Sequence, residues 1–126
     1  MARVVNGCRR ATLSTVAPDG TVAAVPVCFA LTAGRVVTAI DHKPKSTREP
    51  ARVRNIRREP RVTLLFDRWD EQWTRLGWVM LKGLASIERA ADTSVLIERY
   101  PQYREKPPAG PFIVVEPQAI TWWSWE

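Results

Sequence analysis

The chain has 126 residues, of which 45% are hydrophobic and 25% charged, with two cysteines and one histidine. This length fits one domain (residues 1–126) whose core needs no disulfide, and three Cys or His side chains are too few for a structural zinc site, so we expect no metal. The sequence has neither an apolar run of 18 residues nor the apolar segment of a signal peptide, so we expect no membrane contact and a cytoplasmic location.

The net charge of +6 comes from one stretch of the sequence. Residues 43–61 contain eight basic and two acidic residues, and the rest of the chain balances to zero. So concentrated a charge is expected to attract an anion, such as a phosphorylated cofactor, a polyglutamate, a nucleic acid or an acidic lipid surface. The alternative interpretation is the solvated face of a helix.

Strand patterns fill the first third of the chain. We expect strands at residues 10–16, 22–31 and 35–40. Turn residues at 18–21 and 32–34 predict tight connections between them. Pro26 lies inside the second strand and predicts a sheet edge, a bulge or an opening of the ladder, because proline donates no main-chain hydrogen bond.

A helix is predicted to follow the third strand. Ser46-Thr47-Arg48-Glu49 matches a capping box, in which Ser46 accepts a bond from the Glu49 N–H and the Glu49 carboxylate bonds back. Pro50 would then lie in the first turn, where the N–H has no partner within the helix, and Pro60 would end the helix.

The remaining sequence predicts more strands and a second helix. We expect strands at 61–67 and 78–88, a helix at 92–100 capped by Asp92, a proline-rich irregular loop at 101–111, and one or two final strands within 112–115 and 119–125. The predicted fold class is therefore mainly β with helical additions: a closed or split β-barrel of about six strands with two or more helices.

Motifs for catalysis by side chains are absent from the sequence. It has no Gly-x-Ser-x-Gly, no Gly-x-Gly-x-x-Gly and no Walker loop, so an enzymatic reaction would depend on a bound cofactor. The best local candidate is the segment Asp41–Ser46, whose two lysines and hydroxyl at a helix start suit a phosphate. A plain helix cap with two surface lysines is the alternative. The six tryptophans indicate core or interface positions, and a subset could stack on a planar ring.

Six segments follow one another in an order typical of one family. They are Ala11–Thr15, Val25–Phe29, Asp41–Lys45, Arg54–Val62, Trp78–Ala85 and Arg99–Arg104. Their order and spacing resemble the pyridoxamine-phosphate-oxidase-like split barrels, specifically the actinobacterial branch that uses the deazaflavin coenzyme F420. The resemblance covers roughly residues 8–116.

The resemblance implies a homodimer with two cofactor sites at the interface. It implies that the cofactor phosphate is held by Lys43, Lys45, Ser46, Arg52 and Arg54. It further implies that Val25, Pro26 and Val27 lie along the cofactor ring and that Trp78 approaches from the partner subunit. It fixes no catalytic side chain.

The charge distribution helps to choose the cofactor. FMN carries one phosphate, whereas the deazaflavin carries a phosphodiester and an oligoglutamate tail, so a local excess of +6 fits the deazaflavin better. We therefore expect an F420-dependent oxidoreductase that transfers a hydride to or from an unsaturated small molecule. The alternatives are an FMN-binding reductase or oxidase, a non-catalytic cofactor-binding protein and, less in keeping with the sequence, a nucleic-acid-binding module; no nucleic-acid partner is expected.

Overall fold

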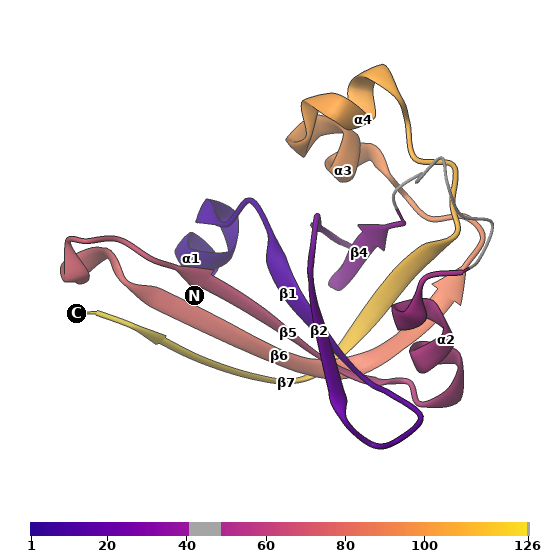
Figure 1. Cartoon of the computed structure of the whole chain (residues 1–126). Helices are drawn as coiled ribbons and strands as arrows, with labels where there is room; N and C mark the ends of the chain where they lie inside the picture. Colours follow the sequence, from indigo (N-terminus) through magenta and orange to yellow (C-terminus); the bar gives the residue numbers. More distant parts are fainter. Residues whose placement is uncertain (41–48, 126) are drawn as a thin grey trace.

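The computed structural model describes residues 1–40 and 49–125. In chain order the elements are α1 (Ala2–Gly7), β1 (Ala11–Val16), β2 (Val22–Val27), β3 (Ala30–Thr32), β4 (Arg35–Ala39), α2 (Ala51–Arg58), β5 (Arg61–Arg68), the 3₁₀ helix η1 (Trp73–Arg75), β6 (Gly77–Glu88), α3 (Ser94–Arg99), α4 (Pro101–Glu105) and β7 (Phe112–Ser124). The strands form one antiparallel sheet in the order β2-β1-β5-β6-β7-β4-β3, which curls into a half-open barrel (Figure 1). The predicted split barrel is confirmed, with seven strands instead of about six.

The first hairpin follows the turn chemistry of its sequence. The Asp19 carboxylate accepts bonds from the Thr21 N–H at 3.0 Å and the Thr21 hydroxyl at 2.6 Å. Gly20 takes a φ of 85°, which side chains disfavour. β2 lies at the edge of the sheet, which confirms the edge position that Pro26 predicts.

The continuous strand predicted for residues 22–31 is wrong, because the structure breaks it after Val27. At the break the Tyr100 hydroxyl accepts a bond from the Phe29 N–H at 3.1 Å and lies 3.3 Å from the Phe29 carbonyl oxygen. The same hydroxyl is 2.9 Å from the Arg9 carbonyl oxygen. A side chain 71 positions away thus replaces a neighbouring strand, and the chain turns there into β3.

β6 and β7 pair along almost their whole lengths, so the two possible final strands are one. The register shifts between Lys82 and Gly83, which face Ala119 and Pro117 and leave Gln118 without an opposite residue. A Cβ on Gly83 would lie 2.4 Å from a main-chain oxygen of β7, so only glycine permits this close approach.

The core fills the concave side of the sheet. Leu13, Leu64 and Ile113 are completely buried, and the rings of Phe29 and Phe66 meet edge to face with centroids 4.8 Å apart. Helix α1 packs on β5 and β6, and α3 packs on β3. A second, smaller cluster joins α3 and α4 to β3 and β4.

The capping box predicted at the start of α2 is wrong. The helix begins at Ala51 with Pro50 as its N-cap, and Glu49 lies outside it. The Glu49 carboxylate accepts a bond from Arg57 Nε at 3.1 Å rather than returning to a capping residue. Proline fits just before a helix because its φ is fixed and it has no N–H to satisfy. Ser46 lies outside the described residues.

The irregular loop predicted for residues 101–111 is also wrong at its start. Residues Pro101–Glu105 form α4, because proline is tolerated in the first turn of a helix. α3 covers a shorter range than predicted, and the Asp92 carboxylate accepts a bond from the Ser94 N–H at 3.0 Å at its beginning. None of the helices in the described ranges is long and apolar enough to cross a membrane.

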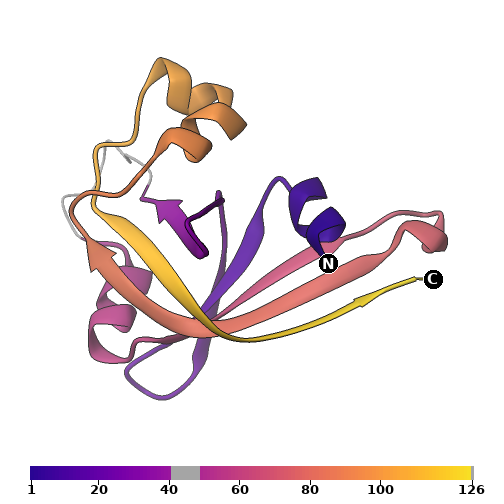
Figure 2. The ribbon, with the colours of Figure 1, turned by 180° about the vertical axis from the view of Figure 1, so that it is seen from behind.

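Three strand ends project from the barrel as an arm. The arm consists of residues 67–79 and 120–125, with η1 at its tip, and both views show it extending away from α2 (Figures 1 and 2). β7 pairs with β4 only as far as Val115, so along the arm the ladder partner of β7 is β6. The arm therefore has an open edge among the described residues.

Candidate functional site

The three residues predicted to lie along a cofactor ring occupy β2. Their side chains alternate, as expected in a strand. Val27 is buried and Val25 packs against the core, whereas Pro26 is exposed on the outer, convex face. On that face only Pro26 of the three presents a side chain to a ligand.

The two arginines predicted for the phosphate lie on α2 and point in different directions. Residues two apart on a helix are about 200° apart around its axis. Arg52 is half-buried, and its Nε is buried with no hydrogen-bond partner in the described part of the chain. Arg54 is exposed and donates to the Glu49 carbonyl oxygen. The structure therefore does not bring Arg52 and Arg54 to one point.

Three further predicted phosphate ligands, Lys43, Lys45 and Ser46, lie outside the described residues. Their contacts with a cofactor remain predictions. The described chain resumes at Glu49, three residues before Arg52.

Trp78 lies far from α2 within one chain. It is on the outer face of β6, 37% exposed, opposite Trp123 of β7 and Asp67 of β5. The contact of β6 with the chain beside α2 is the bond from the Ala85 N–H to the Pro60 carbonyl oxygen, at 2.8 Å. Seven residues of strand separate Trp78 from Ala85, about 24 Å at roughly 3.4 Å per residue. One copy of the chain therefore cannot place Trp78 beside the α2 arginines.

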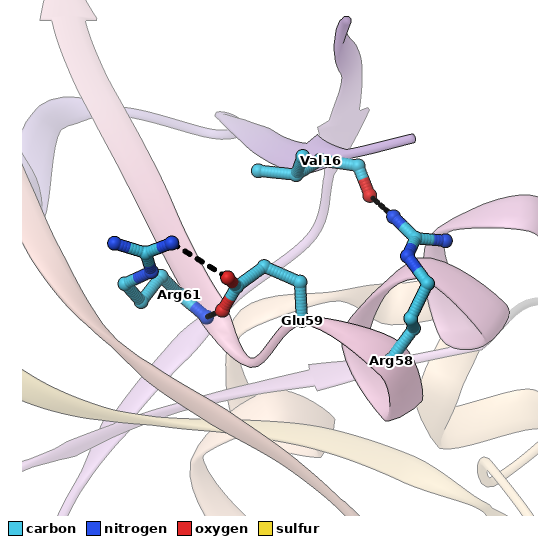
Figure 3. Close-up of polar contacts among 4 residues, drawn as sticks. All are labelled: Val16, Arg58, Glu59 and Arg61. Atoms are coloured by element: carbon cyan, nitrogen blue, oxygen red, sulfur yellow. Dashed lines mark hydrogen bonds and ion pairs between the residues drawn. The ribbon is translucent and has the colours of Figure 1, made fainter. Parts of the chain in front are cut away.

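Three arginines cover the solvent side of α2. Arg54, Arg57, Arg58 and Glu49 line an open hollow of about 670 Å³. Arg58 donates to the Val16 carbonyl oxygen and forms no ion pair with a described carboxylate (Figure 3). Arg57 and Arg58 were not among the predicted ligands, although their spacing of three and four residues from Arg54 places them on the same helix face.

A second hollow adjoins the first at Arg57. It has a volume of about 500 Å³ and is lined by Arg57, Ile87, Arg89, Ala109, Gly110 and Pro111. Among the ion pairs of the described residues, only that of Arg57 with Glu49 involves an arginine of these two hollows. We call the set Arg54, Arg57, Arg58 and Arg89 the arginine surface; the one carboxylate in the lining of the two hollows is that of Glu49.

The neighbouring Arg61 is neutralised instead. Its guanidinium lies 2.7 Å from the Glu59 carboxylate (Figure 3). Hydrogen bonds from the Arg61 side chain hold the pKa of Glu59 below its usual value. Arg61 therefore contributes less free charge than its place in the basic segment suggests.

No described side chain is arranged as a nucleophile or as a metal ligand. The Cys8 thiol is buried, donates to the Val4 carbonyl oxygen at 3.1 Å, and has its pKa raised chiefly by burial, so it stays protonated at neutral pH. Within the described ranges no group of His, Cys, Asp and Glu could hold a metal ion. The site can bind and orient an anion, and its chemistry would come from a cofactor.

All six tryptophans are exposed. Their exposed fractions run from 37% to 65%, so the core alternative for them is wrong. All six lie on the arm, with Trp125 at its end. Exposed tryptophans in one region indicate an interaction surface.

Comparison with known families decides the family of this chain. The family model of pyridoxamine 5'-phosphate oxidase matches residues 1–126, the whole chain. The chain belongs to the pyridoxamine 5'-phosphate oxidase family. This confirms the family resemblance of the sequence and gives the protein the flavin-binding oxidoreductase fold of that family. None of the curated proteins compared with the chain matches it.

Solved structures share the fold of this family member. The conserved hypothetical protein Rv2991 from Mycobacterium tuberculosis is 24% identical, with a TM-score of 0.75 over 99% of this chain and 82% of that one. An F420 reductase is 22% identical, with a TM-score of 0.65 over 94% of each chain. HutZ, the heme storage protein from Vibrio cholerae, is 14% identical, with a TM-score of 0.64 over 98% of this chain and 90% of that one. At these identities the likeness concerns the fold alone.

Proposed function

We propose that the protein is an F420-dependent oxidoreductase that transfers a hydride between the deazaflavin and an unsaturated organic substrate. The observation that carries the proposal is the arginine surface on and beside α2, within a fold of the pyridoxamine 5'-phosphate oxidase family. Bound deazaflavin would supply a carbon centre, C5, that gives or takes the hydride. The protein would bind and orient the cofactor and exclude water.

The environment of Arg52 favours a phosphate group bound beside the start of α2. A buried donor without a partner costs about 1–3 kcal/mol, and more if it is charged. The partnerless Nε of Arg52 is such a donor, and a phosphate oxygen would satisfy it. We propose that Arg52 holds the cofactor phosphate together with Lys43, Lys45 and Ser46, which precede it in the sequence.

The arginine surface favours the deazaflavin over FMN. Guanidinium groups bind carboxylates through two parallel hydrogen bonds. A single phosphate needs few such donors, whereas an oligoglutamate tail offers several carboxylates along its length. The two adjoining hollows extend the cationic surface from Arg54 to Arg89, which suits the longer anion.

A homodimer would complete the site. Trp78 of β6 and Trp123 of β7 are opposite each other, 37% and 42% exposed, and form an aromatic pair on one face of the arm, of the kind that anchors protein interfaces. Trp78 is too far from α2 to act in its own chain, so we propose that it reaches the cofactor of a second copy. A two-fold dimer offers the same patch twice and closes on itself.

Titration of intrinsic tryptophan fluorescence with coenzyme F420 and with FMN tests the proposal. We expect F420 to bind more tightly, and Arg52→Gln to weaken that binding by about tenfold to a hundredfold, since a charge-assisted contact contributes about 1.5–3 kcal/mol. The matched control is Lys106→Gln, an exposed cation at the end of α4. Lys45→Ala is predicted to act like Arg52→Gln.

The other outcomes each decide an alternative. Equal affinities of Arg52→Gln and Lys106→Gln would remove Arg52 from the site. Tighter binding of FMN would replace the proposal by an FMN-binding reductase or oxidase. Binding of neither flavin, with oligonucleotides bound at physiological salt, would make the cofactor function wrong, because phosphate-backbone binding weakens steeply as salt rises.

A further inference from the structure

A third hollow lies on the convex face of the sheet and meets the arginine surface at Val16, whose carbonyl oxygen accepts the bond from Arg58. It has a volume of about 390 Å³ and crosses strands β1, β5, β6 and β7. Its lining is Ser14, Thr15, Val16, Val22, Arg61, Val62, Thr63, Lys82, Gly83 and Gln118. This volume falls within the range of small-molecule sites, and the lining contains two cations and no carboxylate.

The polar side chains of this hollow stand in one row across the sheet. Ser14 is in register with Thr63, and Thr63 is in register with Lys82. Side chains directly opposite on adjacent strands have Cβ atoms about 4.5–5.5 Å apart. Two hydroxyls and an ammonium group therefore lie side by side, within the span of one small ligand.

These groups have no partners of their own in the described residues. None of the hydrogen bonds or ion pairs there engages the side chain of Ser14, Thr63 or Lys82. By contrast, the second cation of the lining, Arg61, is paired with Glu59 at 2.7 Å. Lys82 is therefore the uncompensated charge of the hollow.

An irregularity of the sheet adds a fourth polar group. The register shift between Lys82 and Gly83 leaves Gln118 without an opposite residue, and Gln118 lines the hollow. β-Bulges redirect side chains and are frequent beside functional sites. The closeness of Gly83 to β7, where a Cβ would lie 2.4 Å from the Glu116 carbonyl oxygen, fixes the position of this bulge.

We propose that this hollow binds the carboxylate of a small organic acid, with Lys82 as the charge partner and Ser14, Thr63 and Gln118 as hydrogen-bond donors. The exposed Pro26 lies nearby, because Ala24 of β2 faces Ser14 and Pro26 follows two residues later on the same face. We assign this acid as the substrate of the hydride transfer, an assignment that rests on the proposed function. Binding of the acid itself does not depend on the cofactor.

Titration of the ¹⁵N-labelled full chain with sodium benzoate, followed by NMR, tests the inference. We expect the shifted amides to cluster at Ser14, Thr63, Gly83 and Gln118, and the neutral analogue benzamide to bind at least tenfold more weakly. Lys82→Met should weaken benzoate binding at least tenfold, and Lys82→Arg should restore part of it. Lys106→Met is the matched control, since Lys82 and Lys106 are the two lysines of the described chain.

Equal binding of benzoate and benzamide would overturn the inference, and so would an unchanged benzoate affinity in Lys82→Met. It would also be overturned if inorganic phosphate displaced benzoate at a concentration lower than that at which benzoate itself binds. The last would make the hollow a phosphate site. F420 titration of Lys82→Met separates this inference from the proposed function. Unchanged F420 affinity with lost benzoate affinity supports both, and failure of F420 to bind the unaltered chain would leave the benzoate result standing by itself.

Discussion

The barrel and the arm share strands β5, β6 and β7, but the side chains of these strands are buried to different extents in the two regions. In the barrel, residues of β6 and β7 such as Leu81 and Ile113 are buried by the helices and the curled sheet. On the arm, the same β6 and β7 carry Trp78 at 37%, Trp122 at 53% and Trp123 at 42% exposure. The strand patterns are alike, so the difference lies in what covers them.

This difference indicates that one chain stabilises the barrel by itself, whereas the arm needs a second molecule to cover it. Large apolar side chains gathered on one exposed region mark an interface rather than a core. The barrel should therefore fold as a unit in one copy, while the arm should be completed by a partner. Substitutions in the two regions should have effects of different kinds.

The largest effect on folding should come from Leu64→Ala. Its side chain is 0% exposed, and removal of a buried leucine side chain leaves a cavity that costs about 2–5 kcal/mol of unfolding free energy. Leu31→Ala is the matched control, because Leu31 is 46% exposed on β3 and its loss should cost about 0.5 kcal/mol or less. Urea denaturation measures both, and equal losses would contradict the assignment of the core.

On the arm, Trp123→Ser should act on association instead of folding. A tryptophan near the centre of an interface contributes about 2 kcal/mol or more, so the dimer dissociation constant should rise at least about 30-fold. Sedimentation equilibrium measures the constant, with Leu31→Ser as the control on another strand. An unchanged constant for Trp123→Ser would place the interface elsewhere.

A smaller effect is expected from Tyr100→Phe. Loss of the hydroxyl leaves the Phe29 N–H, which now bonds to it at 3.1 Å, without its partner at the break between β2 and β3. An unsatisfied buried donor costs about 1–3 kcal/mol. Hydrogen exchange of the Phe29 amide should accelerate in the variant, and exchange as slow as in the unaltered chain would show that another group holds the break.

The smallest effect concerns acid stability. Hydrogen bonds from Arg61 lower the pKa of Glu59 in the folded chain from its ordinary value of 4.5. The ionised form is therefore favoured by folding, so this contribution is present above pH 4.5 and is lost as pH falls through the lowered pKa. Glu59→Gln should reduce the loss of stability between pH 7 and pH 3 in urea unfolding, and an identical loss would show that the pair contributes nothing.

Features set by neighbouring residues could be predicted from the sequence. The turn at Asp19-Gly20 depends on one carboxylate and one glycine, and the edge position of β2 follows from the missing N–H of Pro26. The charge excess of residues 43–61 likewise indicated the arginines of α2 before their positions were known.

Features set by contacts between residues outside the local pattern could not be predicted from the sequence. Tyr100 breaks the strand at Phe29 from 71 positions away, and no local pattern signals it. The predicted capping box is wrong because the helix begins at Ala51 and the Glu49 carboxylate bonds to Arg57 in the last turn of α2. The direction of the side chains in the site could not be predicted either: Arg52 and Arg54 are two positions apart in the sequence but lie on different sides of α2.

Sedimentation velocity of the chain mixed with coenzyme F420, detected where the deazaflavin absorbs and protein does not, tests most directly whether two copies together bind the cofactor. We expect the deazaflavin to sediment with a species of about twice the 14.3 kDa chain mass. Deazaflavin that sediments with a 14.3 kDa species, or apart from the protein, would contradict it.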